Sequence, residues 1–232
     1  MTGTIINVIT VLVGSTIGLL IRSRLPERFS KVIFQVFGLF TIFLGVKMAM
    51  ETRELMVMIF SLLTGTLLGE WMNLEKGMDR LAGFLKRKVK SNHERFSEGL
   101  MTSFLVFCMG SMTVLGAIEE GLGEKPNLLL TKALMDGFSS MAFASVMGIG
   151  VLFSVIPLFL YQGGLTLFAG SVGSLLSDPI LAEVTAVGGI LLIGLGFNLL
   201  DVKKIRVMNM LPSLVLAVVL AKWLPPLLER LI

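Results

Sequence analysis

The sequence predicts an all-α protein, a polytopic membrane helix bundle of about eight spans with an inverted-topology repeat of three-helix units. Three observations lead to this prediction. First, 54% of the 232 residues are hydrophobic and only 16% are charged, against about 25% charged in a soluble domain, and the mean hydropathy is +0.87. Second, the charged residues cluster between long apolar runs. Third, two of these apolar runs match each other.

The apolar runs have the length of membrane spans, because about 20 apolar residues in a helix cross the hydrocarbon core of a bilayer. They predict eight spans, over residues 3–21, 32–50, 55–71, 100–118, 133–153, 158–176, 180–200 and 205–224. The first run starts near Met1 with no preceding basic residue and no cleavage site, so we expect an uncleaved helix. Residues 137–177 carry no charge, so a broken helix or re-entrant hairpin near Pro157 fits them as well as two full spans.

The basic residues of the short loops predict the orientation of the spans, since cytoplasmic loops are enriched in lysine and arginine. Three loops are basic: one with Arg22, Arg24, Arg28 and Lys31, the segment 72–99, and one with Lys203, Lys204 and Arg206. The remaining loops are acidic and include Glu119, Glu120 and Glu183. Eight alternating spans place all three basic loops on one side. We therefore expect a multi-pass membrane protein with both termini outside.

The evidence for a repeat is a match between two apolar segments of the chain. Residues 38–47 align with 189–198, with Gly, Ile, Leu and Gly at identical spacings and Lys47 opposite Asn198. The alternating orientation makes spans one to three opposite in polarity to spans six to eight, an arrangement typical of transporters and some channels. The sequence therefore predicts a single membrane domain over 1–232. It consists of repeat one at 1–72, a cytoplasmic loop at 73–99, linking spans at 100–153 and repeat two at 154–226.

Small residues predict where helices pack closely. Gly14-x-x-x-Gly18 and Gly65-x-x-x-Gly69 match the spacing that lets membrane helices approach. We interpret them as internal packing faces, and they permit a homodimer without requiring one. The basic segment 72–99 has apolar residues at helical spacing, so it fits either an interfacial helix on the cytoplasmic leaflet or a solvated connector.

Polar residues inside apolar spans are the candidate site residues, because such groups are costly in hydrocarbon. Gln162 precedes the pair Gly163-Gly164, which we expect to unwind the helix and expose carbonyls. Lys47 and Asn198 share a repeat position; the alternatives are a snorkelling lysine and a helix-to-helix hydrogen bond. The remaining candidates are Asp136 and Glu70, for which a local pair with Lys132 and an interfacial charge are the simpler interpretations. Asn7 has a lower rank.

Other chemistry finds little support in the sequence. Cys108 and Met112 lie one turn apart and could bind Cu(I), but methionine commonly fills gaps in apolar spans, so we expect no metal and no cofactor. There is no P-loop, no H-E-x-x-H and no G-x-S-x-G, and His93 is the single histidine. We therefore do not expect an enzyme. The net charge of +4 reflects topology signals and does not indicate nucleic-acid binding.

Short motifs along the whole chain resemble the YqgA/YdfK-like family of bacterial inner-membrane proteins. The family's function is unknown and a transport role is ascribed to it. The resemblance implies a polytopic membrane protein, with no established substrate or site residues. The motifs are Gly3-Thr4-Ile5-Ile6-Asn7, Gly69-Glu70, Cys108-Met109-Gly110-Ser111-Met112, Lys132-Ala133-Leu134-Met135-Asp136-Gly137, Tyr161-Gln162-Gly163-Gly164-Leu165-Thr166 and Asn209-Met210-Leu211-Pro212.

These observations predict a secondary transporter or channel for a small solute or ion, with its site at the repeat interface near the middle of the bilayer. Lys47 would favour an anionic or zwitterionic substrate, whereas Asp136 and Glu70 would favour a cation or proton. The alternative is a non-transporting membrane scaffold or regulator that binds a partner through the basic segment 72–99. The expected partners are the lipid bilayer and the small solute or ion.

Overall fold

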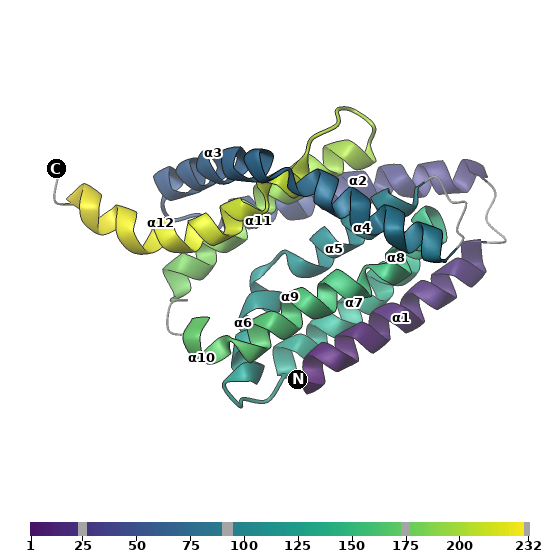
Figure 1. Ribbon diagram of the computed structural model, residues 1–232, viewed down its shortest axis with the longest axis horizontal. Helices are drawn as coiled ribbons and strands as arrows, with labels where there is room; N and C mark the ends of the chain where they lie inside the picture. The colour runs from purple at the N-terminus through teal and green to yellow at the C-terminus, as the bar shows by residue number, and fades with distance from the viewer. Residues whose placement is uncertain (23–26, 90–94, 173–176, 230–232) are drawn as a thin grey trace. The chain divides into compact units, whose positions relative to one another are not determined.

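The computed structural model describes residues 1–22, 27–89, 95–172 and 177–229, and within these ranges every regular element is a helix (Figure 1). Arg24, Lys90 and His93 lie outside the described residues. The elements are α1 (Thr2–Arg22), α2 (Glu27–Ala49), α3 (Leu55–Met72), α4 (Leu74–Lys88), α5 (Phe96–Cys108), α6 (Ser111–Gly121), α7 (Asn127–Met147), α8 (Gly150–Phe153), α9 (Val155–Leu167), α10 (Ala169–Val172), α11 (Asp178–Leu199), the 3₁₀ helix η2 (Val207–Met210) and α12 (Pro212–Glu229).

The helices confirm an all-α protein with apolar segments of membrane-spanning length. In the described part of the chain, five segments are long and apolar enough to cross a membrane: Thr2–Arg22, Leu55–Met72, Gly150–Leu167, Asp178–Leu199 and Val207–Leu224. The bent pair α5 and α6 raises this number to six if it forms one span, and Gln35–Ala49 is a shorter apolar helix. The figure of eight spans stays a prediction.

Helix breaks occur at places that the sequence analysis did not predict. Instead of one helix over 100–118, α5 ends at Cys108, α6 begins at Ser111, and the two axes differ by 64°. Gly110 lies in this break with a φ of +131°, a conformation that favours glycine. The turn within the charge-free stretch lies at Gly148, where φ is +82°, whereas Pro157 sits inside the first turn of α9, where proline is tolerated.

The chain divides into two compact units, which are described separately. Unit 1 contains Met1–Val36, Met78–Cys108 and Met112–Gly173, and unit 2 contains Phe37–Gly77, Met109–Ser111 and Ser174–Ile232. Both predicted repeats contribute helices to each unit, since α1 and α9 belong to unit 1 while α3, α11 and α12 belong to unit 2.

In unit 1, α1 lies along α7, and glycine brings the two backbones into contact (Figure 1). A Cβ added at Gly14 would lie 2.1 Å from the carbonyl oxygen of Gly137, and one at Gly18 would lie 2.2 Å from that of Met141. At the end of α1, Arg22 donates a hydrogen bond of 2.9 Å to the carbonyl oxygen of Val146. The predicted internal role of the Gly14 and Gly18 face is confirmed. The residue numbers of the contacts rise together along α1 and α7, so the two helices are parallel.

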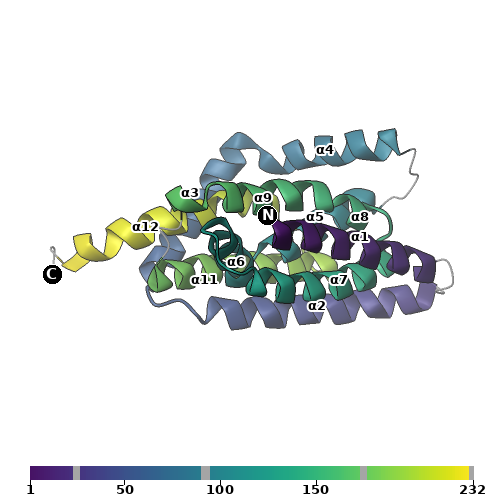
Figure 2. The same cartoon turned by 90° about the horizontal axis from the view of Figure 1, so that it is seen from below.

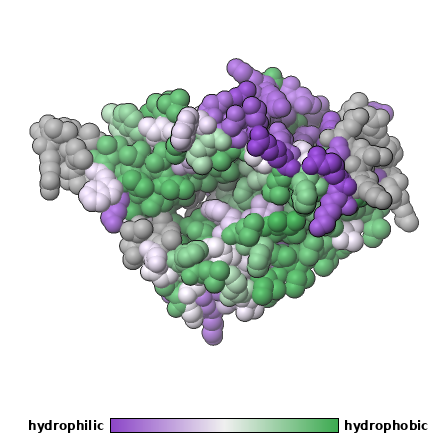
Figure 3. Space-filling view, viewed as in Figure 1, coloured by the Kyte–Doolittle hydropathy of each residue, from purple (hydrophilic) through white to green (hydrophobic). Residues whose placement is uncertain are grey.

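The other face of α1 is apolar and uncovered. Ile5, Ile9, Val13 and Leu20 are between 49% and 68% exposed, as expected for a helix that faces lipid. In Figure 3 the visible side of α1 is largely apolar, whereas hydrophilic residues gather over α4. The apolar side of α4 is covered by protein, because Ala82 and Leu85 pack with Phe96 and Leu100 of α5. We expected either an interfacial helix or a solvated connector here, and the segment contains a helix whose apolar side contacts α5.

In unit 2, the second half of α2 lies beside α11 (Figure 2). A Cβ at Gly45 would lie 2.6 Å from the carbonyl oxygen of Gly189, and a Cβ at Gly196 would lie 2.9 Å from that of Gly38. Because the residue numbers rise along one helix as they fall along the other, the two helices are antiparallel. The two segments that match in sequence therefore pack against each other.

The second close contact in unit 2 joins α3 to the start of α12. A Cβ at Gly65 would lie 2.4 Å from the backbone of Ser213, and a Cβ at Gly69 would lie 1.9 Å from the carbonyl oxygen of Asn209. The residue numbers again rise along one segment as they fall along the other, so the two segments are antiparallel. Gly65-x-x-x-Gly69 is thus an internal packing face, as predicted.

The contact between α1 and α7 can be tested with one methyl group. We expect Gly14→Ala to destabilise the protein by about 1–3 kcal/mol, because the methyl group would separate two backbones that touch. Gly164→Ala is the matched control, since nothing lies within 4 Å of a Cβ there and alanine is the better helix former. The readout is thermal unfolding in detergent, and equal melting temperatures for the two variants would contradict the contact.

Candidate functional site

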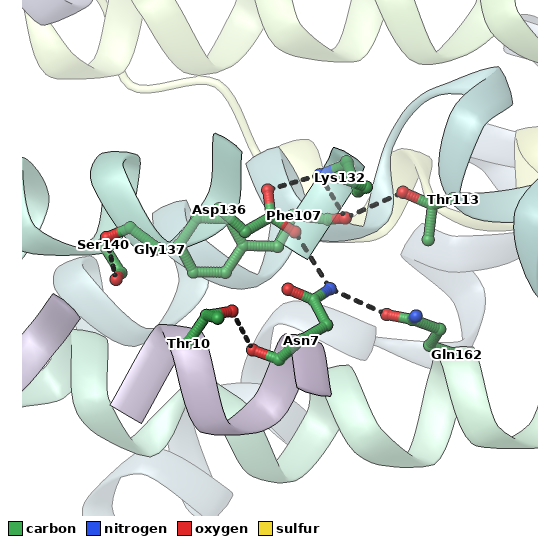
Figure 4. Close-up of polar contacts among 9 residues, drawn as sticks. All are labelled: Asn7, Thr10, Phe107, Thr113, Lys132, Asp136, Gly137, Ser140 and Gln162. Carbon is green, nitrogen blue, oxygen red and sulfur yellow. Dashed lines mark hydrogen bonds and ion pairs between the residues drawn. The ribbon is translucent and has the colours of Figure 1, made fainter. Parts of the chain in front are cut away.

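A buried polar network joins three helices of unit 1 (Figure 4). At its centre, the amide nitrogen Nδ2 of Asn7 on α1 donates to Oδ2 of Asp136 on α7 at 3.1 Å and to Oε1 of Gln162 on α9 at 2.9 Å. Asn7 and Gln162 are 0% exposed and Asp136 is 3% exposed. Two of the predicted site residues, Gln162 and Asp136, therefore meet through Asn7.

Lys132 extends the network to the helix break. Its Nζ donates to Oδ1 of Asp136 at 2.5 Å and to the carbonyl oxygen of Phe107 at 3.1 Å, and it lies 6.0 Å from the centroid of the Phe107 ring. The hydroxyl of Thr113 donates to the same carbonyl at 3.0 Å. The predicted pair of Lys132 and Asp136 one turn apart is therefore present, and because Lys132 is 8% exposed it is buried in the protein. Removing either partner would leave an uncompensated charge, which is strongly destabilising.

Two amide atoms at the centre of this network have no protein partner within the described residues. They are Oδ1 of Asn7, an acceptor, and Nε2 of Gln162, a donor. A buried polar atom without a hydrogen bond costs about 1–3 kcal/mol. Such atoms call for a particular explanation, of which a bound water or ligand is one. A hydrogen-bond donor would satisfy Oδ1 of Asn7, and an acceptor would satisfy Nε2 of Gln162.

A second polar layer continues from Gln162 along α9. The hydroxyl of Thr166 donates to the carbonyl oxygen of Gln162 at 3.1 Å and lies 3.4 Å from the hydroxyl of Thr4. The carboxylate of Glu120, at the end of α6, accepts from the backbone nitrogens of Gly3 at 2.6 Å and Thr4 at 3.4 Å. Glu120 thereby satisfies the free N–H groups at the start of α1, where the helix dipole favours an anion.

Unit 2 holds an equivalent carboxylate at the start of α3. Glu183 is 2% exposed, and it accepts from the hydroxyl of Thr52 at 2.8 Å and from the backbone nitrogens of Arg53 at 2.6 Å and Glu54 at 2.9 Å. Among the described residues, its hydrogen-bond partners are the three residues that lead into α3. The role of Glu183 is therefore structural capping.

Two of the other predicted site residues also make structural contacts in unit 2. Asn198 donates to the carbonyl oxygen of Ile205 at 2.8 Å and accepts from its backbone nitrogen at 2.6 Å. Glu70 pairs with Arg206 and accepts from Nδ2 of Asn209, whose Oδ1 in turn accepts from the backbone nitrogen of Glu75 at 2.7 Å. These bonds secure the segment between α11 and α12 and the junction of α3 and α4.

The remaining predicted residues are Lys47, Gly163 and Gly164. Lys47 is in the last turn of α2 and its side chain is exposed. Helix α9 runs from Val155 to Leu167 without a break at the glycine pair, so the predicted unwinding at these glycines is wrong. A Cβ at Gly163 would lie 3.3 Å from Met1. Gly163 thus lets α9 lie close to the start of α1, next to Gln162.

The sequence analysis gave Asn7 a low rank, placed Lys132 in a local pair at the membrane interface and placed Glu120 in a loop, whereas the structure buries all three side chains. A periodic pattern could have corrected this. The buried face of α1 consists of Gly3, Thr4, Asn7, Val11, Gly14, Ser15 and Gly18, so Asn7 shares a face with the packing glycines. On α7, the buried face includes four residues spaced four apart, namely Lys132, Asp136, Ser140 and Ala144. Small residues at helical spacing indicate a protein-facing side, and polar residues on that side are buried.

The polar groups of the network set the chemistry that the site offers. Within the described ranges, no group of three or more His, Cys, Asp or Glu side chains could hold a metal ion. Cys108 is free and buried. The available chemistry is hydrogen bonding from amides and hydroxyls, together with the charges of Lys132 and Asp136.

The central role of Asn7 predicts a large effect of its removal. Asn7→Leu keeps the size but deletes two donors, leaving Oδ2 of Asp136 and Oε1 of Gln162 with lost hydrogen bonds, so we expect a loss of about 2–4 kcal/mol. Thr16→Val is the control, because the hydroxyl of Thr16 is exposed and bonds only within α1. Thermal unfolding in detergent measures both, and a loss in Asn7→Leu no greater than in the control would contradict the network.

Comparison with known proteins gives a family over nearly the whole chain. The family described as "Protein of unknown function (DUF554)" matches residues 2–222. The chain is 33% identical over 220 residues to "Uncharacterized membrane protein YdfK" of Bacillus subtilis (strain 168), covering 93% of each chain. It is 34% identical over 227 residues to "Uncharacterized protein YqgA" of Escherichia coli (strain K12), covering 95% of this chain and 97% of the relative.

No solved structure matches the chain. The two relatives are those that the sequence motifs indicated, and the match extends through every helix that builds the polar network. With its apolar helices of spanning length, the protein is a helical membrane protein, and the chain belongs to the DUF554 family.

Proposed function

We propose that this protein is a secondary transporter or channel for a small solute or ion in the bacterial cytoplasmic membrane. The observation that carries the proposal is the network of Asn7, Asp136 and Gln162, buried among apolar helices with two amide atoms left unpaired. Polar and ionisable groups inside membrane helices are rare and usually mark the path of an ion or substrate. A packed scaffold would have no comparable need for them.

The break between α5 and α6 supports the same proposal. Discontinuous helices in transporters direct helix ends and free carbonyls at bound ions or substrates. Here the last turn of α5 presents the carbonyl oxygen of Phe107 to the ammonium of Lys132, which also contacts Asp136. A helix end and the buried network thus belong to one site.

The pairing of helices supports an inverted repeat. Gly38 matches Gly189 in the repeat, and Gly45 matches Gly196. The contact of Gly38 with Gly196 is therefore the symmetry equivalent of the contact of Gly45 with Gly189. A two-fold axis between α2 and α11 would produce this result. The repeat also makes α1 equivalent to α9 and α3 equivalent to α12. Within each of these pairs the two helices contact each other and run antiparallel.

The repeat interpretation places the site between the two triplets. Asn7 belongs to the first predicted triplet and Gln162 to the second, and they are joined by a hydrogen bond of 2.9 Å. Both side chains are 0% exposed, so the proposal assigns this conformation to a closed state. Movement of α1 relative to α9 would then open the site to one side of the membrane.

The proposal is tested by a search for a ligand followed by a flux measurement. Purified protein is screened by thermal shift against inorganic ions, amino acids and organic acids, and each stabilising compound is tested for uptake into proteoliposomes. We expect Gln162→Leu to abolish both stabilisation and uptake, because Gln162 offers a buried donor that has no partner among the described residues. The matched control is Gln35→Leu, whose side chain is exposed on α2.

Two outcomes would contradict the proposal. One is a stabilising compound that acts equally on Gln162→Leu and on the control, which would move the site elsewhere. The other is a compound that binds in a Gln162-dependent manner but never crosses the membrane of proteoliposomes, which would favour a sensor or regulator.

A further inference from the structure

The environment of the Lys132 ammonium is that of a bound cation. Its Nζ contacts two oxygens, the carboxylate Oδ1 of Asp136 at 2.5 Å and the carbonyl of Phe107 at 3.1 Å. The Phe107 ring lies 6.0 Å away and adds a cation–π attraction. Each of these groups attracts positive charge, and Figure 4 shows them converging on the lysine.

The position of Phe107 strengthens this attraction. Phe107 is the penultimate residue of α5, and the last four carbonyls of a helix lack intrahelical partners. The same end carries the negative pole of the helix dipole. Because α5 stops at Cys108 and the next helix is bent away by 64°, this pole remains beside Lys132 and is not cancelled by a following turn.

The two oxygens that contact the ammonium are of the kinds that bind metal ions. Carboxylate, carbonyl and amide oxygens are the ligands that hard cations prefer. In broken membrane helices such oxygens and helix C-termini coordinate sodium ions or protons. The oxygens of Asp136 and Phe107 are ligands of this kind.

We propose that the oxygens of Asp136 and Phe107, beside the Phe107 ring, form a site for a monovalent metal cation, which the ammonium of Lys132 occupies as a cation attached to the chain. The site takes Na⁺ or K⁺ when the ammonium is removed, and it needs neither ion when Lys132 is present. If the protein is a transporter, as proposed above, its transport does not require sodium or potassium at this position. This consequence for ion coupling rests on the proposed function.

The test compares three proteins in detergent: the natural sequence, Lys132→Met, and the double variant Lys132→Met with Asp136→Asn. Each is prepared in choline chloride, which is then replaced by sodium or potassium chloride at constant ionic strength, and unfolding is followed by tryptophan fluorescence. We expect the melting temperature of Lys132→Met to rise by about 5 °C or more at saturation. The natural protein and the double variant should show no selective rise, since one keeps its ammonium and the other lacks the carboxylate charge.

Several outcomes would overturn the proposal. They are the absence of a selective rise in Lys132→Met, and an equal rise in all three proteins. If Lys132→Met does not survive extraction in choline chloride, the proposal requires that sodium or potassium chloride recover it in folded form. Loss of Lys132→Met in all three salts, with recovery of the double variant, would show that no metal cation replaces the ammonium.

The same experiment separates this proposal from the proposed function. The readout is ion binding to protein in detergent, so a negative result removes the cation site and leaves the transport proposal intact. A cation response in Lys132→Met, together with a failure to find any transported compound in proteoliposomes, would support the cation site and remove the transport proposal.

Discussion

The buried carboxylate of Asp136 is the constraint on which the arrangement of unit 1 depends. An ionised carboxylate among apolar helices is tolerated only with a positive partner and further hydrogen bonds. Lys132 supplies the charge from the preceding turn of α7, and Asn7 supplies the hydrogen bond from α1. Lys132 in turn needs the carbonyl of Phe107, and Asn7 also contacts Gln162. One acid therefore links α1, α5, α7 and α9, and each partner added to it brings another helix to the same place.

This network can form only because the helices come very close together. At Gly14 and Gly18 the backbones of α1 and α7 leave no room for a Cβ, which puts Asn7 within reach of Asp136 although both side chains are short. Van der Waals contact of this kind is the main source of helix association where lipid removes the hydrophobic driving force. The same device recurs in unit 2, between α2 and α11 and between α3 and α12. Glycine positions and polar positions thus depend on one another.

A second feature shared by the two units is a buried glutamate at a helix N-terminus. Glu120 binds the first N–H groups of α1, and Glu183 binds those that precede α3. Backbone N–H groups at the end of an apolar helix have little water to bond, so an anion from another helix both satisfies them and matches the dipole. Loop charge counts had assigned both acids to exposed outer loops. The example shows that an acid beside a span can be a tertiary contact when a helix begins next to it.

The sequence by itself determined the helical class, most of the apolar segments, the family and the internal nature of the two glycine faces, because each follows from local composition or from spacing along one helix. It also selected Gln162 and Asp136, since a polar residue inside an apolar run is visible without a structure. The tertiary structure alone decided that Asn7 joins them, that the Lys132 pair is buried, and that Asn198 and Glu70 have structural partners. It also decided that the chain breaks near Gly110 and not at Gly163 and Gly164. The physical reason is that burial and hydrogen bonding depend on which helix lies opposite, and residues more than a hundred positions apart in the chain make those contacts.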